Sequence, residues 1–332
     1  MPNEELKADL VFEGGGVKGI GFVGALAVGE EKGYTWADTA GTSAGAILAA
    51  LVAAGYTAQE LRKIMTELDY KKFIDPTFFS KLALPGKVIS VLATKGIYKG
   101  DWFENWLSQL LAAKGVRTFG NLVDKEWAES LQYRYKLRVI ASDISNGRLL
   151  ELPQGIKDYG ILPDDLNVAA AVRMSMSIPF FFKPAKIKDM KNNLDCCIVD
   201  GGLLSNFPVW LFDYNGDPGD YPTFGLKLVE PDEGVPHRIT SPVSLGMAMF
   251  STMFSAYDRK HIDDKDFMRT IPIPTLGVGT TDFNLSKKRS EDLYQSGRQS
   301  AEKFFKTWNF DVYKQKLAKL SAVPSRRERL WK

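Results

Sequence analysis

The chain has few of the residues that usually mark a specialised class of protein. Its 332 residues include only two cysteines and two histidines, and 43 basic residues nearly balance 40 acidic ones, for a net charge of +3. The adjacent Cys196 and Cys197 provide neither a disulfide framework nor the C-x-x-C spacing of a metal or redox site. The near-neutral balance argues against nucleic-acid binding through a strongly basic surface. We therefore expect no metal, no cofactor and no nucleic-acid partner.

Long apolar segments of the kind that cross membranes are also missing. The N-terminus, Met1-Pro2-Asn3-Glu4-Glu5, lacks the basic start and apolar run of a signal peptide. One long uncharged stretch, residues 239–257, contains Pro242 and several Ser and Thr residues, so it lacks the steady apolarity of a spanning helix. We expect a cytoplasmic protein that contacts a membrane only peripherally.

What the sequence does contain is a regular alternation of strand and helix patterns. Parallel strands need helical crossovers, so this alternation predicts an α/β sandwich with a central, largely parallel sheet. Short apolar runs between turns predict strands at residues 8–13, 37–40, 135–143, 147–152, 197–199 and 223–229. Helices are predicted after the glycines at 14–16, over 46–52, and over 57–68, 101–114 and 165–176.

No repeat or clear boundary divides the chain, so we expect a single domain over residues 1–332, with its core motifs in 8–229. Residues 70–100 have no regular pattern and contain prolines, glycines, scattered apolar side chains and interspersed lysines. This segment is predicted to be a lid or insertion over an apolar trough, and a plain helical cover on the core is the alternative. Residues 237–332 are predicted to be mainly helical, with one strand at 268–273.

The first motif that carries chemistry is Gly41-Thr42-Ser43-Ala44-Gly45, a G-x-S-x-G sequence between a predicted strand and a predicted helix. Small neighbours allow a strained turn that exposes the serine hydroxyl. The N-terminus of the following helix favours the negative charge that develops during acyl transfer. A tight turn without chemistry is the alternative for so short a pattern.

The second motif is the loop Gly14-Gly15-Gly16-Val17-Lys18-Gly19. Three consecutive glycines leave backbone N–H groups able to approach an oxyanion or a phosphate. The same residues match G-x-G-x-x-G, and Asp38 stands where a dinucleotide fold would place its ribose-binding acid. The loop alone therefore fits two functions, and the serine turn that follows favours the oxyanion.

The third motif is Asp200-Gly201-Gly202, directly after an apolar run. A carboxylate at the end of a strand can reach a neighbouring hydroxyl, although an aspartate before glycine also serves as a turn cap. His237 and His261 lie in a polar loop and a charged stretch, settings that make both poor candidates for a catalytic base. An aspartate base needs burial, because its ordinary pKa of about 3.9 is low, so we predict a partly desolvated Asp200.

The three motifs in this order resemble those of the patatin-like phospholipase family: G-G-G-x-[RK]-G, G-x-S-x-G and D-G-[GA]. Further stretches that resemble the family are residues 141–143, 171–182 and 206–208, and the resemblance covers about residues 8–229. It implies a three-layer α/β/α patatin-like sandwich, a Ser43–Asp200 catalytic dyad, and an oxyanion hole from Gly15 and Gly16. It also implies that Lys18 could hold a lipid phosphate, and a solvated lysine at a helix start is the alternative.

Residues and resemblance together predict a lipid acyl hydrolase, a phospholipase A-type serine esterase that acts on phospholipid or another acyl-ester lipid. The remaining motif glycines, Gly14, Gly19, Gly41, Gly45, Gly201 and Gly202, are expected to have structural roles. Two other functions stay open: a lipid-binding module without activity, and a dinucleotide-dependent oxidoreductase that uses the loop from Gly14 to Gly19.

Overall fold

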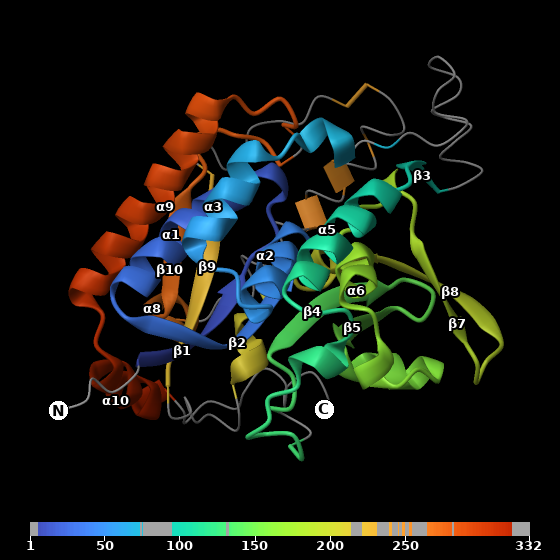
Figure 1. Cartoon of the computed structure of the whole chain (residues 1–332), viewed down its shortest axis with the longest axis horizontal. Coiled ribbons are helices and arrows are strands. Elements are labelled where there is room, and N and C mark those ends of the chain that lie inside the picture. Colours follow the sequence, from blue (N-terminus) through green and yellow to red (C-terminus); the bar gives the residue numbers. More distant parts are fainter. Residues whose placement is uncertain are drawn as a thin grey trace.

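The computed structural model describes the chain at residues 6–73, 75, 95–130, 133–213, 221–230, 239–240, 245, 248–249, 252–253, 264–280 and 282–320. Its centre is an eight-stranded mixed sheet with the order β10-β9-β1-β2-β4-β8-β7, in which β5 also pairs with β4 (Figure 1). The strands are β1 Leu6–Phe12, β2 Tyr34–Thr42, β4 Leu137–Asp143, β5 Arg148–Leu152, β7 Ala185–Asp189, β8 Leu194–Asp200, β9 Thr223–Val229 and β10 Thr270–Pro274.

Most strands of this sheet are parallel, as the alternating pattern predicts. The pairs β1–β2, β1–β9, β9–β10 and β2–β4 are parallel, whereas β5, β7 and β8 join through antiparallel pairs. A second small sheet pairs β3 with β6, and the sequence patterns did not predict it or β7. The strands of the small sheet are β3 Gly96–Tyr98 and β6 Phe180–Phe182.

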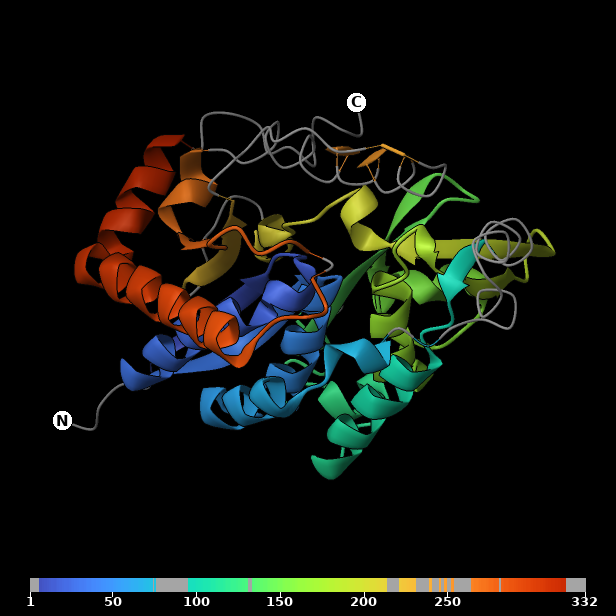
Figure 2. The same ribbon diagram turned by 90° about the horizontal axis from the view of Figure 1, so that it is seen from above.

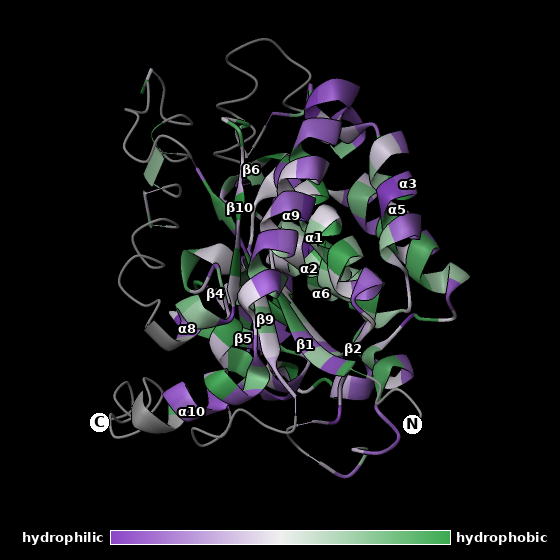
Figure 3. Cartoon of the chain, turned by 90° about the vertical axis from the view of Figure 1, so that its left-hand side faces the viewer, coloured by the Kyte–Doolittle hydropathy of each residue, from purple (hydrophilic) through white to green (hydrophobic). Residues whose placement is uncertain are grey.

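Helices cover the sheet on both faces. Figure 3 places α1, α2, α3, α6 and α9 on one side of the sheet and α8 on the other. The larger core lies under the first group, and a smaller core of Val11, Ala40 and Ile140 packs against Phe207 and Phe212 on the opposite face. The arrangement is a three-layer α/β/α sandwich. Its helices are α1 Ile20–Glu31, α2 Ala44–Ala53, α3 Ala58–Glu67, α5 Asp101–Ala113, α6 Val168–Ser175, α8 Asp264–Met268, α9 Lys287–Thr307 and α10 Phe310–Leu320.

The C-terminal part of the chain is built into this sandwich. The predicted strand near residues 268–273 is confirmed as β10, which extends the sheet beside β9. Helix α9 lies along α1 (Figure 2). The two backbones approach so closely that a Cβ on Gly24 would lie 2.0 Å from the Tyr294 carbonyl oxygen, and one on Gly297 would lie 1.8 Å from the Gly21 carbonyl oxygen. This contact explains why α1 is rich in small residues.

Other predictions for the helices and the insertion have mixed outcomes. The helix predicted over 57–68 is confirmed as α3, and Thr57 forms a capping box with Glu60 at its N-terminus. The helix predicted over 165–176 begins later, because the side chain of Asn167 caps α6. Most of the predicted lid, residues 76–94, lies outside the described residues. The assignment of residues 1–332 to one domain stays a prediction.

Candidate active site

Ser43 lies in the sharp turn between β2 and α2. Its backbone has φ 54° and ψ −129°, a strained conformation for a residue with a side chain. The flanking glycines are required by close packing, since a Cβ on Gly45 would lie 2.5 Å from the carbonyl oxygens of Phe12 and Glu13. A Cβ on Gly41 would in turn lie 2.5 Å from the Gly45 carbonyl oxygen. The G-x-S-x-G sequence therefore forms the strained turn that was predicted.

Asp200 is the last residue of β8, and the sheet brings it beside Ser43. The Ser43 hydroxyl donates a hydrogen bond of 2.6 Å to Asp200 Oδ2, and the Gly202 N–H donates one of 2.8 Å to Asp200 Oδ1. Burial raises the pKa of Asp200 to about 7, although the hydrogen bonds from Ser43 and Gly202 lower it. The predicted desolvation is confirmed, because the side chain is fully buried. A carboxyl group with this pKa can accept a proton near neutral pH.

The glycine loop lies at the same pocket as Ser43. Gly16 has φ 61°, and a Cβ on it would lie 2.0 Å from the Thr280 carbonyl oxygen, which accepts a hydrogen bond from the Val17 N–H. Within the described part of the chain, the N–H groups of Gly15 and Gly16 donate no hydrogen bond. Gly16 and Ser43 line one pocket. The two amides can therefore serve an oxyanion that forms at Ser43, and this role stays a prediction.

Two buried charged side chains hold the glycine loop. The carboxylate of Glu13 accepts hydrogen bonds from Lys227 Nζ at 2.5 Å, the Leu228 N–H at 2.5 Å and Asn206 Nδ2 at 3.2 Å. The Lys18 side chain is 5% exposed and forms a 2.9 Å ion pair with Glu230. The alternative of a solvated lysine is therefore wrong, and contact with a lipid phosphate stays a prediction.

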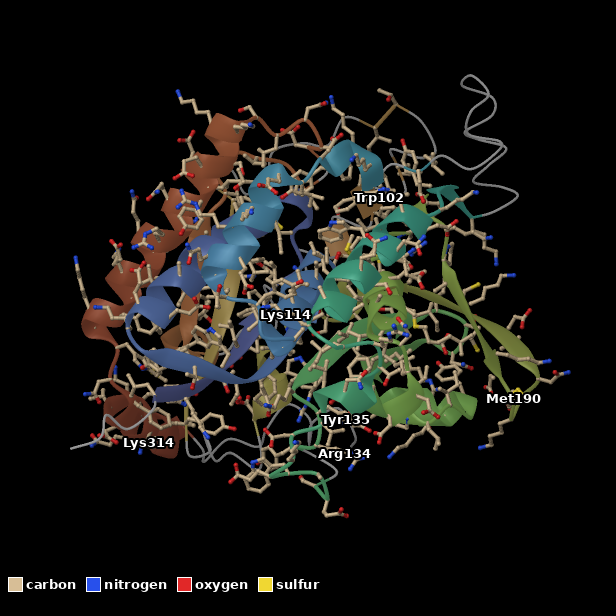
Figure 4. The ribbon with its side chains drawn as sticks, viewed as in Figure 1. Trp102, Lys114, Arg134, Tyr135, Met190 and Lys314 are labelled. Atoms are coloured by element: carbon tan, nitrogen blue, oxygen red, sulfur yellow. The ribbon has the colours of Figure 1, made fainter. Side chains whose placement is uncertain are left out.

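An apolar pocket opens from Ser43. Its walls come from the glycine loop, α2, the end of α3, η2 (Tyr70–Phe73), α5, the segment after α6 and the loop before α9. Trp102, which Figure 4 labels, lies at the N-terminal end of α5. Its ring stacks on that of Trp106 in the pocket wall, with centroids 6.2 Å apart. Such a lining suits an acyl chain. The lining residues are Gly16, Val17, Gly19, Ser43, Ala44, Ile47, Leu48, Met65, Leu68, Tyr70, Phe73, Trp106, Met176, Ile178, Phe182, Thr280 and Phe283.

The features that suggested other functions lie elsewhere or outside the described residues. Asp38 stands four residues before the end of β2, and its N–H donates a hydrogen bond to Asp9 Oδ1. It is therefore away from the loop end at which a ribose would bind. His237 and His261 lie outside the described residues. In the described ranges, no group of His, Cys, Asp and Glu is arranged to hold a metal, and no helix is long and apolar enough to cross a membrane.

Several residues of the site were missed by sequence reasoning. Ser175 accepts a hydrogen bond from the Ser43 N–H at 2.8 Å, and Asn206 accepts one from the Gly14 N–H through its carbonyl oxygen at 3.1 Å. Both belong to stretches that resemble the family, but nothing in the local pattern gave them a role. Thr280 and Phe283 come from a loop that is far from the motifs in sequence.

The chain is similar to several known proteins. A family model described as patatin-like phospholipase matches residues 10–213. The uncharacterized protein YqhO of Bacillus subtilis (strain 168) is 40% identical over 306 residues, which cover 91% of this chain and 99% of that protein. The uncharacterized protein R571 of Acanthamoeba polyphaga mimivirus is 28% identical over 312 residues, covering 89% of this chain and 92% of that protein.

Among solved structures, VipD from Legionella pneumophila has a similar fold. Its crystal structure matches with a TM-score of 0.54 at 17% identity, and the match covers 92% of this chain and 67% of that one. At this identity the likeness concerns the fold alone. The family model spans more than half of the chain and all three motifs, and the chain therefore belongs to the patatin-like phospholipase family.

Proposed function

We propose that this protein is a phospholipase A-type serine esterase that cleaves fatty acyl esters with Ser43 as nucleophile and Asp200 as base. The observation that carries the proposal is the 2.6 Å hydrogen bond from Ser43 Oγ to a buried carboxylate, beside an apolar pocket that Ser43 lines. Family membership supports the coarser statement, a lipid acyl hydrolase.

In the acylation step, Asp200 takes the hydroxyl proton while Ser43 Oγ attacks the ester carbonyl carbon. The carbonyl oxygen becomes an oxyanion, which the N–H groups of Gly15 and Gly16 stabilise, with help from the positive end of α2. The tetrahedral intermediate then collapses, and protonated Asp200 returns its proton to the departing alkoxide. The lysolipid leaves, and the fatty acyl group stays as an ester on Ser43.

The same groups serve deacylation. Asp200 takes a proton from a water molecule, whose oxygen attacks the acyl-serine carbonyl. The second oxyanion is held by the same amides, and Ser43 recovers its proton from Asp200 as the fatty acid leaves. Loss of one oxyanion donor typically raises the activation barrier by about 3 to 4 kcal/mol. The glycine loop is therefore expected to lower the barrier by as much as a catalytic side chain.

The substrate class follows from the pocket. Its aliphatic and aromatic walls match the chain of a fatty acid, and the described residues that form them include no charged side chain. The two methionines among its walls, Met65 and Met176, can adapt to chains of different shape. Binding of phospholipid from a membrane surface is consistent with these features and is part of the proposal.

A fluorophosphonate probe gives the direct test. We expect stoichiometric labelling of Ser43, release of fatty acid from phosphatidylcholine vesicles, and loss of both in Ser43→Ala. Asp200→Asn should abolish turnover, whereas a double replacement of His237 and His261 by alanine should retain it. Vesicle binding without labelling or fatty acid release would support a lipid-binding module instead. An increase in melting temperature with NAD or NADP, with activity intact in Ser43→Ala, would support the oxidoreductase.

A further inference from the structure

A short segment at the end of α6 contacts the backbone of both proposed catalytic residues. The Ser43 N–H donates a 2.8 Å hydrogen bond to Ser175 Oγ, and the Asp200 N–H donates one of 2.9 Å to the Ser177 carbonyl oxygen. Residues 175–177 therefore hold the nucleophile and the base from one side. Ser175 and Ser177 are both fully buried, so water cannot replace these bonds.

The Ser175 hydroxyl has a second partner that fixes its orientation. It donates a 2.6 Å hydrogen bond to the Ile140 carbonyl oxygen of β4. Ile140 pairs with Thr42, the residue before the nucleophile, and its carbonyl oxygen lies so close to Gly201 that a Cβ there would be 2.1 Å away. The hydroxyl is thus anchored to a carbonyl group that lies between the two elements of the dyad.

The bond from Ser43 has a specific consequence for the turn. Ser43 is held at a positive φ, which a residue with a side chain seldom adopts and which persists only when the surroundings impose it. A buried N–H without a partner is costly, so the turn keeps this conformation most readily while Ser175 accepts the hydrogen bond. The bond also occupies the Ser43 N–H, which leaves Gly15 and Gly16 as donors to an oxyanion.

We propose that Ser175 is a positioning residue, which holds the Ser43 backbone in the strained conformation from which the hydroxyl reaches Asp200. The inference rests on the proposed function. It assigns Ser175 no contact with substrate. Ser175 affects the reaction rate only because it fixes the position of Ser43.

Ser175→Ala removes the hydroxyl with little change in volume. The Ser43 N–H loses its acceptor, and the turn can relax away from Asp200. We expect kcat for a soluble p-nitrophenyl ester to fall about 10- to 100-fold, the range that follows when a buried donor is left unpaired. KM should stay within about twofold, because Ser175 is not among the residues that line the pocket. The rate of fluorophosphonate labelling should fall in parallel with kcat.

The pH profile separates positioning from a general loss of packing. The hydrogen bond from Ser43 lowers the pKa of Asp200, and within the described residues no charged side chain contributes to that pKa. A weaker Ser43–Asp200 bond must therefore raise the pKa of Asp200. The acid limb of kcat/KM should move to higher pH in Ser175→Ala. A loss of packing alone would lower the rate without moving this limb.

Two further variants complete the experiment. Ser175→Thr keeps the hydroxyl and should restore the wild-type acid limb and most of kcat. Ser296→Ala is the matched control, because Ser296 of α9 is also buried and donates to a carbonyl oxygen, that of Pro274, away from the site. It should leave kcat and the pH profile unchanged.

The outcomes are distinct for the two proposals. If the wild type shows turnover and labelling, but Ser175→Ala keeps kcat within twofold or keeps the acid limb in place, the positioning role is overturned and the proposed function stands. If Ser175→Ala fails to fold, Ser175→Thr decides, and a folded threonine variant with kcat reduced more than tenfold overturns the role. A wild type without turnover or labelling overturns both proposals.

Discussion

Replacement of Asp200 by asparagine should remove the proposed activity and yet stabilise the protein at neutral and alkaline pH. Asparagine has nearly the same shape and can keep both local hydrogen bonds. Its Oδ1 can accept from the Gly202 N–H, and its amide group can donate to the Ser43 hydroxyl, which then acts as the acceptor. The change therefore removes a buried charge, while the Gly202 N–H and the Ser43 hydroxyl each keep a hydrogen-bond partner at residue 200.

The magnitude follows from the pKa of the carboxyl group. Burial raises the pKa of Asp200 from 3.8 to about 7, a difference of about 3 units. Between these pH values the unfolded chain releases the proton while the folded protein keeps it, so the free energy of unfolding of the wild type falls as pH rises. The loss is about 1.4 kcal/mol per pH unit and reaches about 4 kcal/mol above pH 7.

Urea unfolding at pH 5 and pH 8 would measure the effect. The advantage of Asp200→Asn over the wild type should grow by about 2 to 3 kcal/mol between these pH values. Other buried carboxyls, such as Asp9 and Asp38, are common to both proteins and cancel in the difference. Asp195→Asn, on an exposed position of the same strand, should show no such growth. An advantage that is equal at both pH values, or a less stable asparagine variant at pH 8, would refute the raised pKa.

Three further predictions concern catalysis. The value of kcat/KM should rise about tenfold per pH unit up to about pH 7 and then level off, because Asp200 must be ionised; a flat profile from pH 5 to 8 would contradict this. Gly16→Ala should lower kcat at least about 100-fold, because its Cβ would strike the Thr280 carbonyl oxygen. Gly33→Ala is the control, because Gly33 also has a positive φ of 88° but no atom lies within 4 Å of its added Cβ. An equal loss of kcat in both variants would contradict the explanation by the Thr280 contact. Phe283→Ala should shift the preferred p-nitrophenyl esters toward longer acyl chains, whereas the exposed Phe267→Ala should not.

The local units of the fold could be predicted because each is encoded over a short distance. Apolar runs that end at Gly14 or at Gly41 predict a strand, a turn and a helix, and the structure has these elements. The capping box of Thr57 is likewise a matter of neighbouring residues. Features that depend on remote partners were missed. Helix α5 was predicted, but its anchoring was not: the Asp75 carboxylate accepts hydrogen bonds from the N–H groups of Gly100 and Trp102 across an intervening segment of the chain.

The residues of the pocket likewise fall into those that the local sequence indicates and those that depend on remote contacts. Its residues from the motif regions, such as Ser43 and Gly16, were candidates from the sequence. Phe283 was not a candidate from the sequence, and it lies at the pocket because α9 and β10 complete the sandwich. In the structure Phe283 stacks on Phe181 with ring centroids 5.7 Å apart. No periodicity within either segment could reveal a contact between side chains so far apart in the chain.

The sequence by itself determined which chemical groups are present and that each stands in a glycine-rich turn after a strand, because turn conformation depends on adjacent residues. Only the tertiary structure decided that they meet. Strand β8 runs antiparallel to β4 and overlaps it just at its end, where Asp200 pairs with Ala141, one residue beyond the Ile140 that pairs with Thr42. That register brings the carboxyl group to the serine, and the surrounding core excludes the water that would otherwise keep its pKa low.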